Sequence, residues 1–293
     1  PASAAPGILP PEAVFAATSR GLAAKSLTPA RASFERVFIT GSVSEIFRAV
    51  HAATGAPPLF PRWSAGFINT EWGIDQKELM EIIDGYVTRS LPLDAFILDF
   101  DWCDWGGEPY GEWRWHAGRF PGGADGSLAA SLAAKGVALG GIIKPRIHVD
   151  TEQGRYDAEH GYFWNGQKPY RDYFSKKTVR DLDFRNPGAR AWFWSHFREV
   201  FRSGLTGFWN DEADEGFPSA QFHFLQKALY DGQRGESGTR VWSLNRNFYL
   251  GSQRHAYGIW SGDISSGFAP MRRQRERMLA AINCGAMRWS MDT

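Results

Sequence analysis

Short apolar runs alternate with amphipathic stretches through most of the chain, a pattern typical of parallel strands joined by crossover helices. One helix is well marked, because Phe193, Phe197 and Phe201 recur every four residues on one face after a first-turn proline. The expected strands cover residues 65–70, 95–99, 138–144, 207–211, 241–246, 258–260 and 286–291, and one more is expected near residue 37. The expected helices cover residues 43–54, 76–90, 126–135, 187–202, 219–231 and 270–283.

Seven such strand and helix units in register predict an α/β fold, a (β/α)8 TIM barrel whose eighth strand would lie beyond Thr293. A doubly wound open sheet is the competing architecture. The barrel is favoured because no Gly-x-Gly-x-x-Gly loop follows any expected strand. Polar residues also recur at the end of nearly every strand, rather than at one switch point.

The composition excludes several classes of protein. The 33 Lys and Arg residues nearly balance the 32 Asp and Glu residues, and no basic block occurs, so no nucleic-acid or anionic membrane partner is expected. No apolar run approaches the roughly 20 residues that cross a bilayer, so we expect a soluble protein, either cytoplasmic or exported. Two cysteines are too few for a disulfide scaffold. The seven histidines include no His-x-x-x-His or His-x-His pair, and no metal or cofactor is expected.

Acidic residues follow four of the expected strands, and cations follow two of the others. The acids are Asp99 with Asp101, Asp211, Asp263 and Asp292, and the cations are Lys144 with Arg146, and Arg246. In a barrel the carboxyl ends of all strands meet at one mouth, so we expect these side chains to be neighbours.

A single Asp after a strand is usually a helix N-cap or a turn residue. Capping does not explain why Trp209 and Trp260 precede Asp211 and Asp263 by two or three residues. Tryptophan beside carboxylates is typical of sugar sites, because the ring covers the C–H face of a sugar while acids bind its hydroxyls. Two carboxylates on opposite sides of a bond suffice for glycoside hydrolysis.

These motifs resemble glycoside hydrolase family 31, from about residue 60 to the end of the chain. The resemblance is carried by Pro-Arg-Trp-Ser-Ala-Gly-Phe at 61–67, Glu-Trp-Gly at 71–73, Leu-Asp-Ala-Phe-Ile-Leu-Asp-Phe-Asp-Trp at 93–102, Trp-Asn-Asp at 209–211, and the block from Arg246 through Gly-Ser-Gln-Arg at 251–254 to Trp-Ser-Gly-Asp at 260–263. It implies that Asp211 is the nucleophile and Asp263 the acid/base. It also implies that Asp99, Arg246 and Asp292 bind the substrate. From their positions in the sequence we expect Trp72, Asp101, Lys144, Trp209 and Trp260 to be further substrate-binding residues.

The resemblance further implies a retaining α-glycosidase that hydrolyses terminal α-linked sugar residues, α-glucosidase-like, with an α-linked oligosaccharide or glycoside as its partner. An α-xylosidase, an α-transglycosylase and a noncatalytic carbohydrate-binding homologue stay open as alternatives. The oligomeric state also stays open.

Three departures from the family's pattern bear on the substrate. Glu212-Ala213-Asp214-Glu215 stands where the family usually has Met-Asn-Glu, Lys144-Pro145 where it has Asp-Pro, and Ile264 where it often has Asn. Two alternatives follow for Lys144 and Arg146. Either they bind an anionic substituent on the sugar, or they pair with Asp101 or Glu212 and hold the mouth together.

The expected domain division is the end of an N-terminal domain with a linker at 1–60 and a partial catalytic barrel at 61–293. The chain starts with Pro rather than Met, so we expect a fragment of a longer protein. The polar and aromatic stretch at 147–183 is expected to be an inserted loop or subdomain that forms a rim at the substrate entrance. A solvated excursion with its own aromatic cluster is the alternative.

Overall fold

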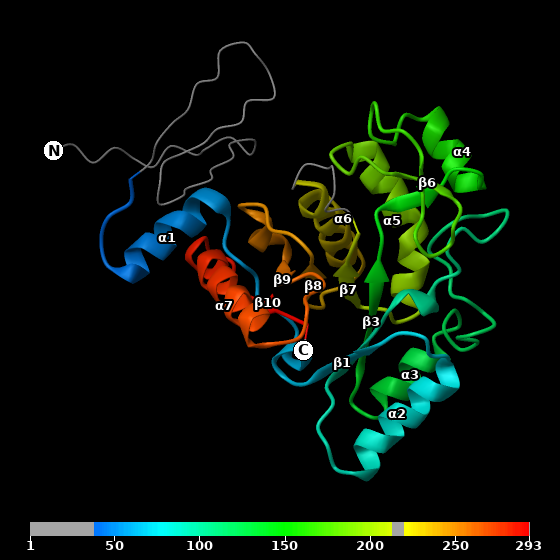
Figure 1. Ribbon diagram of the computed structural model, residues 1–293, viewed down its shortest axis with the longest axis horizontal. Helices are drawn as coiled ribbons and strands as arrows, with labels where there is room; N and C mark the ends of the chain where they lie inside the picture. The colour runs from blue at the N-terminus through cyan, green and yellow to red at the C-terminus, as the bar shows by residue number, and fades with distance from the viewer. Residues whose placement is uncertain (1–37, 213–219, 293) are drawn as a thin grey trace.

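A seven-stranded parallel sheet forms the centre of the protein in a computed structural model, which describes residues 38–212 and 220–292. Each strand pairs in parallel with the next, in the order β1-β2-β3-β7-β8-β9-β10. The strands are β1 (Ile68–Glu71), β2 (Ala95–Leu98), β3 (Ala138–Ile143), β7 (Gly207–Asn210), β8 (Trp242–Asn245), β9 (Gly258–Trp260) and β10 (Trp289–Ser290) (Figure 1).

This strand order confirms the predicted fold class. A doubly wound sheet reverses its strand order at a switch point, whereas here every strand lies beside its predecessor in the sheet. All seven strands fall within or overlap the ranges expected from the sequence. The strand expected near residue 37 is not found in Phe38–Thr40, the described part of that range.

Helices follow the strands as the apolar periodicity predicts. They are α2 (Gln76–Thr88), α3 (Ser127–Ala133), α5 (Pro187–Arg202), α6 (Ala220–Glu236) and α7 (Phe268–Asn283). Asp75 and Glu78 form a capping box at the start of α2, and the Asn186 side chain caps α5 ahead of a first-turn proline. The expected first residue of α6, Ser219, lies outside the described residues.

The core lies between the sheet and these helices. Helix α5 buries Phe193 and Phe197 completely, and the Phe197 ring packs at 5.9 Å, edge to face, on Phe208 of β7. Each fully buried side chain of this kind contributes roughly 1.5–3 kcal/mol. The face of α5 that the four-residue spacing marks in the sequence is therefore the face that packs against the sheet.

The inserted segment forms a small sheet of its own. Strands β4 (Arg146–His148), β6 (Thr178–Asp181) and β5 (Tyr170–Arg171) pair antiparallel in the order β4-β6-β5, and helix α4 (Glu152–Glu159) lies between the first two in the sequence. Because β4 starts three residues after β3 ends, this small sheet begins at the carboxyl end of the main sheet.

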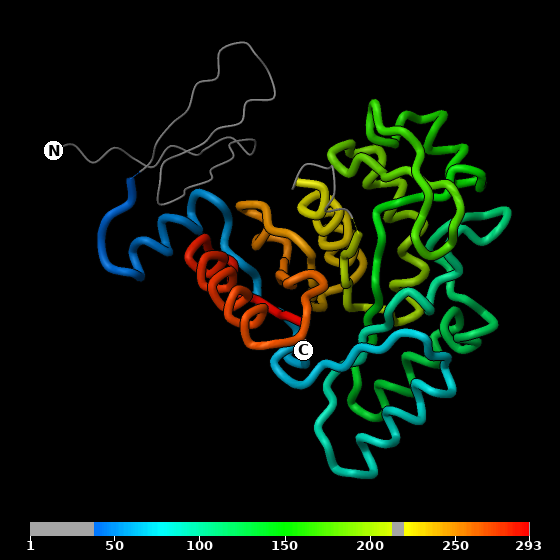
Figure 2. The backbone as a smooth tube through the Cα atoms, viewed as in Figure 1, coloured from blue at the N-terminus to red at the C-terminus, as the bar shows by residue number. Residues whose placement is uncertain are grey.

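Helix α1 (Val43–Thr54) meets the turn that follows α7, where a Cβ on Gly285 would lie 3.4 Å from the ring of His51, although the two segments are far apart in sequence (Figure 2). Gln253 Nε2 donates hydrogen bonds to Thr54 Oγ1 at 2.8 Å and to the carbonyl of Gly55 at 3.0 Å. These contacts tie the end of α1 to the β8–β9 connection. No described helix has the length and apolar character needed to cross a membrane.

Candidate active site

Asp211 and Arg246 lie side by side because they follow neighbouring strands that are in register. Asn210, which ends β7, pairs with Asn245, which ends β8. Asp211 and Arg246 are the next residues after these strand ends, and Arg246 Nη1 donates a 2.9 Å hydrogen bond to Asp211 Oδ1. Only 7% of Asp211 is exposed. The register of two strands therefore builds the first ion pair of the site.

A network of buried amide side chains links the strand ends that carry this pair. Asn210 Nδ2 donates to Asn245 Oδ1 at 2.7 Å and to Gln226 Oε1 at 3.0 Å. Asn245 Nδ2 donates in turn to Ser243 Oγ and to the carbonyl of Gly258. These polar side chains are fully buried, so their mutual hydrogen bonds fix the strand ends that carry the charged residues.

Arg246 also reaches Asp263, which follows β9 by three residues. Arg246 Nη2 donates a 2.8 Å hydrogen bond to Asp263 Oδ2. Gly262 has a φ of +71°, and a Cβ there would lie only 3.2 Å from Arg246 Nε. A glycine suits this turn both for its backbone and for the space that the guanidinium needs. One guanidinium thus binds both carboxylates of the expected catalytic pair.

The carboxyl groups of the site differ in their electrostatic surroundings. Burial raises the pKa of Asp211, although Arg246 and Lys144 act against the rise. Burial also raises the pKa of Asp99 to about 6, opposed by the 2.7 Å hydrogen bond from the backbone N–H of Phe100. The Asp263 side chain is 78% exposed. The site therefore contains two sheltered acids and one that faces solvent.

One cavity of about 240 Å³ collects most of these residues. The expected site residues in its lining are Trp72, Asp99, Trp209, Asp211, Arg246 and Asp263. The lining is completed by Phe100, Ile142, Phe174 and Glu212. Sites for drug-sized ligands usually measure about 300–1,000 Å³, so this cavity lies just below that range.

Four expected site residues lie outside this lining, namely Asp101, Lys144, Trp260 and Asp292. Asp101 pairs with Arg119 and accepts a hydrogen bond from the backbone N–H of Gly73. Trp260 Nε1 donates a 2.6 Å hydrogen bond to Asp292 Oδ1, and Asp292 lines a separate hollow beside α7. In this structure these four side chains make contacts within the protein around the cavity.

Lys144 and Arg146 belong to a charge cluster that is balanced within the protein. Lys144 Nζ lies 3.3 Å from Glu212 Oε1, and Arg146 contacts both Glu212 and Asp172. Burial lowers the pKa of Lys144, which is 1% exposed, to about 7; Arg146 lowers it further and Asp172 opposes this. Of the two alternatives for these cations, the structure favours pairing within the protein, with Glu212 as partner and Asp101 bound elsewhere.

Two residues that line the 240 Å³ cavity were not among the site residues expected from the sequence. Phe174 comes from the inserted segment, whose aromatic composition was its signal, and its ring centroid lies 4.3 Å from that of Phe100. Glu212 follows Asp211 directly and has a φ of +58°. The sequence pattern marked it as a departure from the family and gave it no place in the lining.

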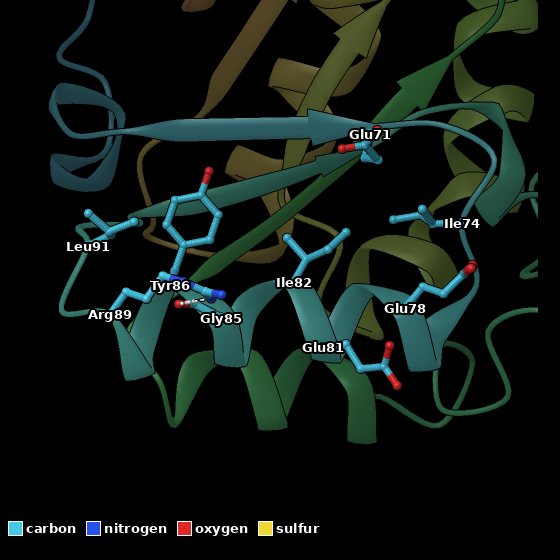
Figure 3. A pocket seen from close by; sticks show the side chains of 9 residues that line it. All are labelled: Glu71, Ile74, Glu78, Glu81, Ile82, Gly85, Tyr86, Arg89 and Leu91. Carbon is cyan, nitrogen blue, oxygen red and sulfur yellow. Dashed lines mark hydrogen bonds between the residues drawn. The ribbon is translucent and has the colours of Figure 1, made fainter.

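A larger hollow, of about 600 Å³, lies between β1 and α2 (Figure 3). Its lining includes Glu71, Glu78, Glu81 and Arg89 among apolar side chains, and none of the aspartates that follow the strands. It therefore does not carry the expected chemistry. Residues 38–212 and 220–292 contain no group of three or more His, Cys, Asp or Glu side chains that could hold a metal ion.

Comparison with known proteins identifies the fold that carries this cavity. Residues 57–293 match the Glycosyl hydrolases family 31 TIM-barrel domain. The chain belongs to glycosyl hydrolase family 31. The chain is 36% identical over 289 residues to a 1,6-alpha-glucosyltransferase of Sporosarcina globispora, and the match covers 90% of this chain and 22% of the relative. It is 25% identical over 276 residues to an alpha-xylosidase of Saccharolobus solfataricus, covering 86% of this chain and 36% of the relative.

A solved structure supports the same assignment. The crystal structure of a family 31 alpha-xylosidase from a soil metagenome, complexed with xylose, superposes with a TM-score of 0.76 at 28% identity. The match covers 85% of this chain and 39% of that protein. The chain therefore spans well under half the length of these three proteins.

Proposed function

We propose that this domain is the catalytic barrel of a retaining α-glycosidase that removes terminal α-linked sugar residues. The observation that carries the proposal is the guanidinium of Arg246, which hydrogen-bonds Asp211 and Asp263 at 2.9 and 2.8 Å. Carboxyl pairs of retaining glycosidases lie about 5–5.5 Å apart, and those of inverting enzymes about 6.5–9.5 Å. The shared guanidinium keeps the two carboxyl groups within about 8 Å of each other, a range that includes the retaining separation, and membership of family 31 is the reason for inferring retention.

Asp211 acts as the nucleophile in the first step. Its Oδ atom forms a bond to the anomeric carbon as the glycosidic C–O bond breaks, and Asp263 gives its proton to the departing oxygen. In the second step Asp263 takes a proton from water, the water oxygen bonds to the same carbon, and the ester to Asp211 breaks. The two inversions restore the starting configuration.

The surroundings of Asp211 suit a buried nucleophile. Attack requires the carboxylate form, which burial disfavours, and Arg246 supplies the opposing positive charge. Asp263 faces the solvent side, where the leaving group departs and water enters. The carboxylate of Asp99 and the aromatic faces of Trp72 and Trp209 bind the hydroxyls and ring of the sugar from the cavity wall.

Chemical rescue with azide tests both assignments in the full-length protein. Asp211→Ala should lower turnover of an aryl α-glycoside by at least about 10⁴-fold. Azide should then restore turnover and give the β-glycosyl azide, because it enters on the face that Asp211 would attack. Asp263→Ala should instead give the α-glycosyl azide, since the covalent intermediate forms first. Reversed anomers, or full activity of Asp211→Ala, would contradict the proposal.

Asp84→Ala serves as a matched control. Asp84 lies on α2, is half exposed, and its carboxylate pairs with the surface residue Lys135. Its removal should leave turnover and its azide response unchanged.

A glucosyltransferase is the second candidate, favoured by the 36% identity to the 1,6-alpha-glucosyltransferase. It would use the same two acids and pass the sugar to a hydroxyl of another sugar instead of to water. Product analysis at rising acceptor concentration separates the two functions: a transferase forms mainly oligosaccharides, a hydrolase mainly free sugar. A noncatalytic carbohydrate-binding protein would not require both Asp211 and Asp263.

A further inference from the structure

We propose that Phe174 determines which sugar fits the cavity, and that Ser175 and His148 position its ring. The inference rests on the proposed function and deepens it. Phe174 stands in the turn between β5 and β6, residues 172–177, which we call the hairpin tip. The hairpin tip is the part of the inserted segment that reaches the cavity.

The Phe174 ring forms one wall of the cavity together with Phe100. Their centroids are 4.3 Å apart with an interplanar angle of 32°, and Lys144 Nζ lies 4.0 Å from the Phe174 centroid. Phe174 is nevertheless 39% exposed, and it lies in a turn outside the strands. Its position therefore depends on what anchors the hairpin tip.

The first anchor is a chain of side-chain hydrogen bonds from the residue next to Phe174. Ser175 Oγ lies 2.6 Å from His148 Nε2, and His148 Nδ1 contacts Glu112 Oε1. Glu112 is completely buried and also accepts hydrogen bonds from the backbone N–H groups of His148 and Gly106. The chain thus joins the exposed turn to a fully buried carboxyl group.

The space for the imidazole ring comes from Gly106. A Cβ at this position would lie 2.5 Å from Cγ of His148, and Gly106 has a φ of +63°. His148 itself is 2% exposed. The ring therefore cannot turn away from Ser175 without moving packed neighbours.

A second anchor ties the hairpin tip to the charge cluster beside the proposed nucleophile. The Asp172 side chain accepts a hydrogen bond from the backbone N–H of Ser175 and pairs with Arg146. Lys177 Nζ donates a 3.0 Å hydrogen bond to the carbonyl of Gly106. Phe174 is held between these attachments, so its ring is preorganised before a sugar enters.

The hydrogen-bonded chain Ser175–His148–Glu112 has the same residue types as a serine-histidine-acid catalytic triad. The hydrogen bonds of the neighbouring backbone N–H groups argue against a catalytic role for it. The N–H of Ser175 is bound to Asp172, that of Lys176 to the carbonyl of Asp172, and that of Lys177 to Ser175 Oγ. These N–H groups are committed to the turn and do not form an oxyanion hole. The geometry therefore points to positioning.

A double-mutant cycle in the full-length protein tests the inference with a pair of substrates, an aryl α-glucoside and an aryl α-xyloside, which differ by one hydroxymethyl group. Phe174→Ala should change the ratio of their kcat/KM values by at least about tenfold, mainly through KM. Ser175→Ala should shift the ratio in the same direction by about threefold, and Ser175→Thr should restore it. In the Phe174→Ala background, Ser175→Ala should have no further effect.

Hydrogen exchange measures the anchoring without turnover. The amides of Ser175 and Lys177 should exchange about tenfold faster in Ser175→Ala, and at the normal rate in the matched control Ser131→Ala on α3. Unchanged exchange, an unchanged substrate ratio in Phe174→Ala, or additive effects in the cycle would each overturn the inference. If the protein turns over neither glycoside, the proposed function fails. The inference about Phe174 is then tested with the ratio of the dissociation constants of the same two glycosides, measured by calorimetry.

Discussion

Arg246 Nη1 donates a 2.9 Å hydrogen bond to Oδ1 of Asp211, and the two residues follow adjacent strands that are paired in register. The bond offsets part of the cost of burying the carboxylate that we propose as the nucleophile. The second terminal nitrogen of the same guanidinium binds Asp263. The pH dependence of the proposed reaction therefore depends on this arginine.

Arg246→Met should shift the acidic limb of the kcat/KM profile to higher pH by about one unit or more. The substitution keeps the apolar stem and removes the charge that lowers the pKa of Asp211, so the carboxyl group of Asp211 ionises only at a higher pH. A shift of one unit corresponds to about 1.4 kcal/mol. Arg246→Lys retains the charge and should shift the limb less. A limb that does not move in Arg246→Met would rule out this role.

Asp99→Asn should remove a pH dependence of KM near pH 6. Because burial raises the pKa of Asp99 to about 6, a sugar hydroxyl meets the stronger acceptor, the carboxylate, only above that pH. We expect the wild-type KM to rise as the pH falls below 6. The variant should have a KM higher by about 10- to 100-fold and flat between pH 5 and 7, measured by steady-state kinetics. A KM in wild type that is constant over this range would contradict the assignment.

Neutral α-glycosides should be better substrates than acidic ones by at least about tenfold in kcat/KM. Lys144 and Arg146 are already paired with Glu212 and Asp172, so no net positive charge remains for an anionic substituent. Lys144→Met should leave this preference in place. Its stability cost should stay below the roughly 3–5 kcal/mol that removing one partner of a buried ion pair usually costs, because Glu212 keeps Arg146 as a partner and the methionine packs among Phe100, Trp105 and Phe174. A preference for acidic glycosides that disappears in Lys144→Met would show the opposite role.

Asp157→Asn should stabilise the protein at pH 8. Asp157 on α4 is completely buried, neither carboxyl oxygen has a hydrogen-bond partner among the described residues, and burial raises its pKa to about 8. In the unfolded chain the group ionises near pH 4, so between about pH 4 and 8 the folded state binds more protons. Stability therefore falls as the pH rises through this window, by at most about 1.4 kcal/mol per unit.

Denaturant unfolding at several pH values checks this prediction. The variant should gain roughly 2–4 kcal/mol at pH 8 and little at pH 4.5. Asp150→Asn, an exposed position just before the same helix, is the control and should change neither value by more than about 0.5 kcal/mol. Equal stability of wild type and Asp157→Asn at both pH values would contradict the buried, protonated state.

The sequence alone determined the strand positions, the barrel class and the residues that follow each strand. Alternating apolar segments and helical periods encode these features locally, and the parallel order β1-β2-β3-β7-β8-β9-β10 then brings the strand ends to one rim. Asp211 and Arg246 could be expected as neighbours on this basis, since both come directly after buried strands.

Only the tertiary structure decided which side chains of the rim turn into the cavity. Asp101 turns to Arg119 and Asp292 to Trp260, whereas Phe174 arrives from a hairpin that is remote in sequence. Such choices depend on side-chain reach and packing across elements far apart in the chain, which local periodicity does not encode. The apolar pattern fixes where each strand ends, and contacts between distant segments fix where its last side chains point.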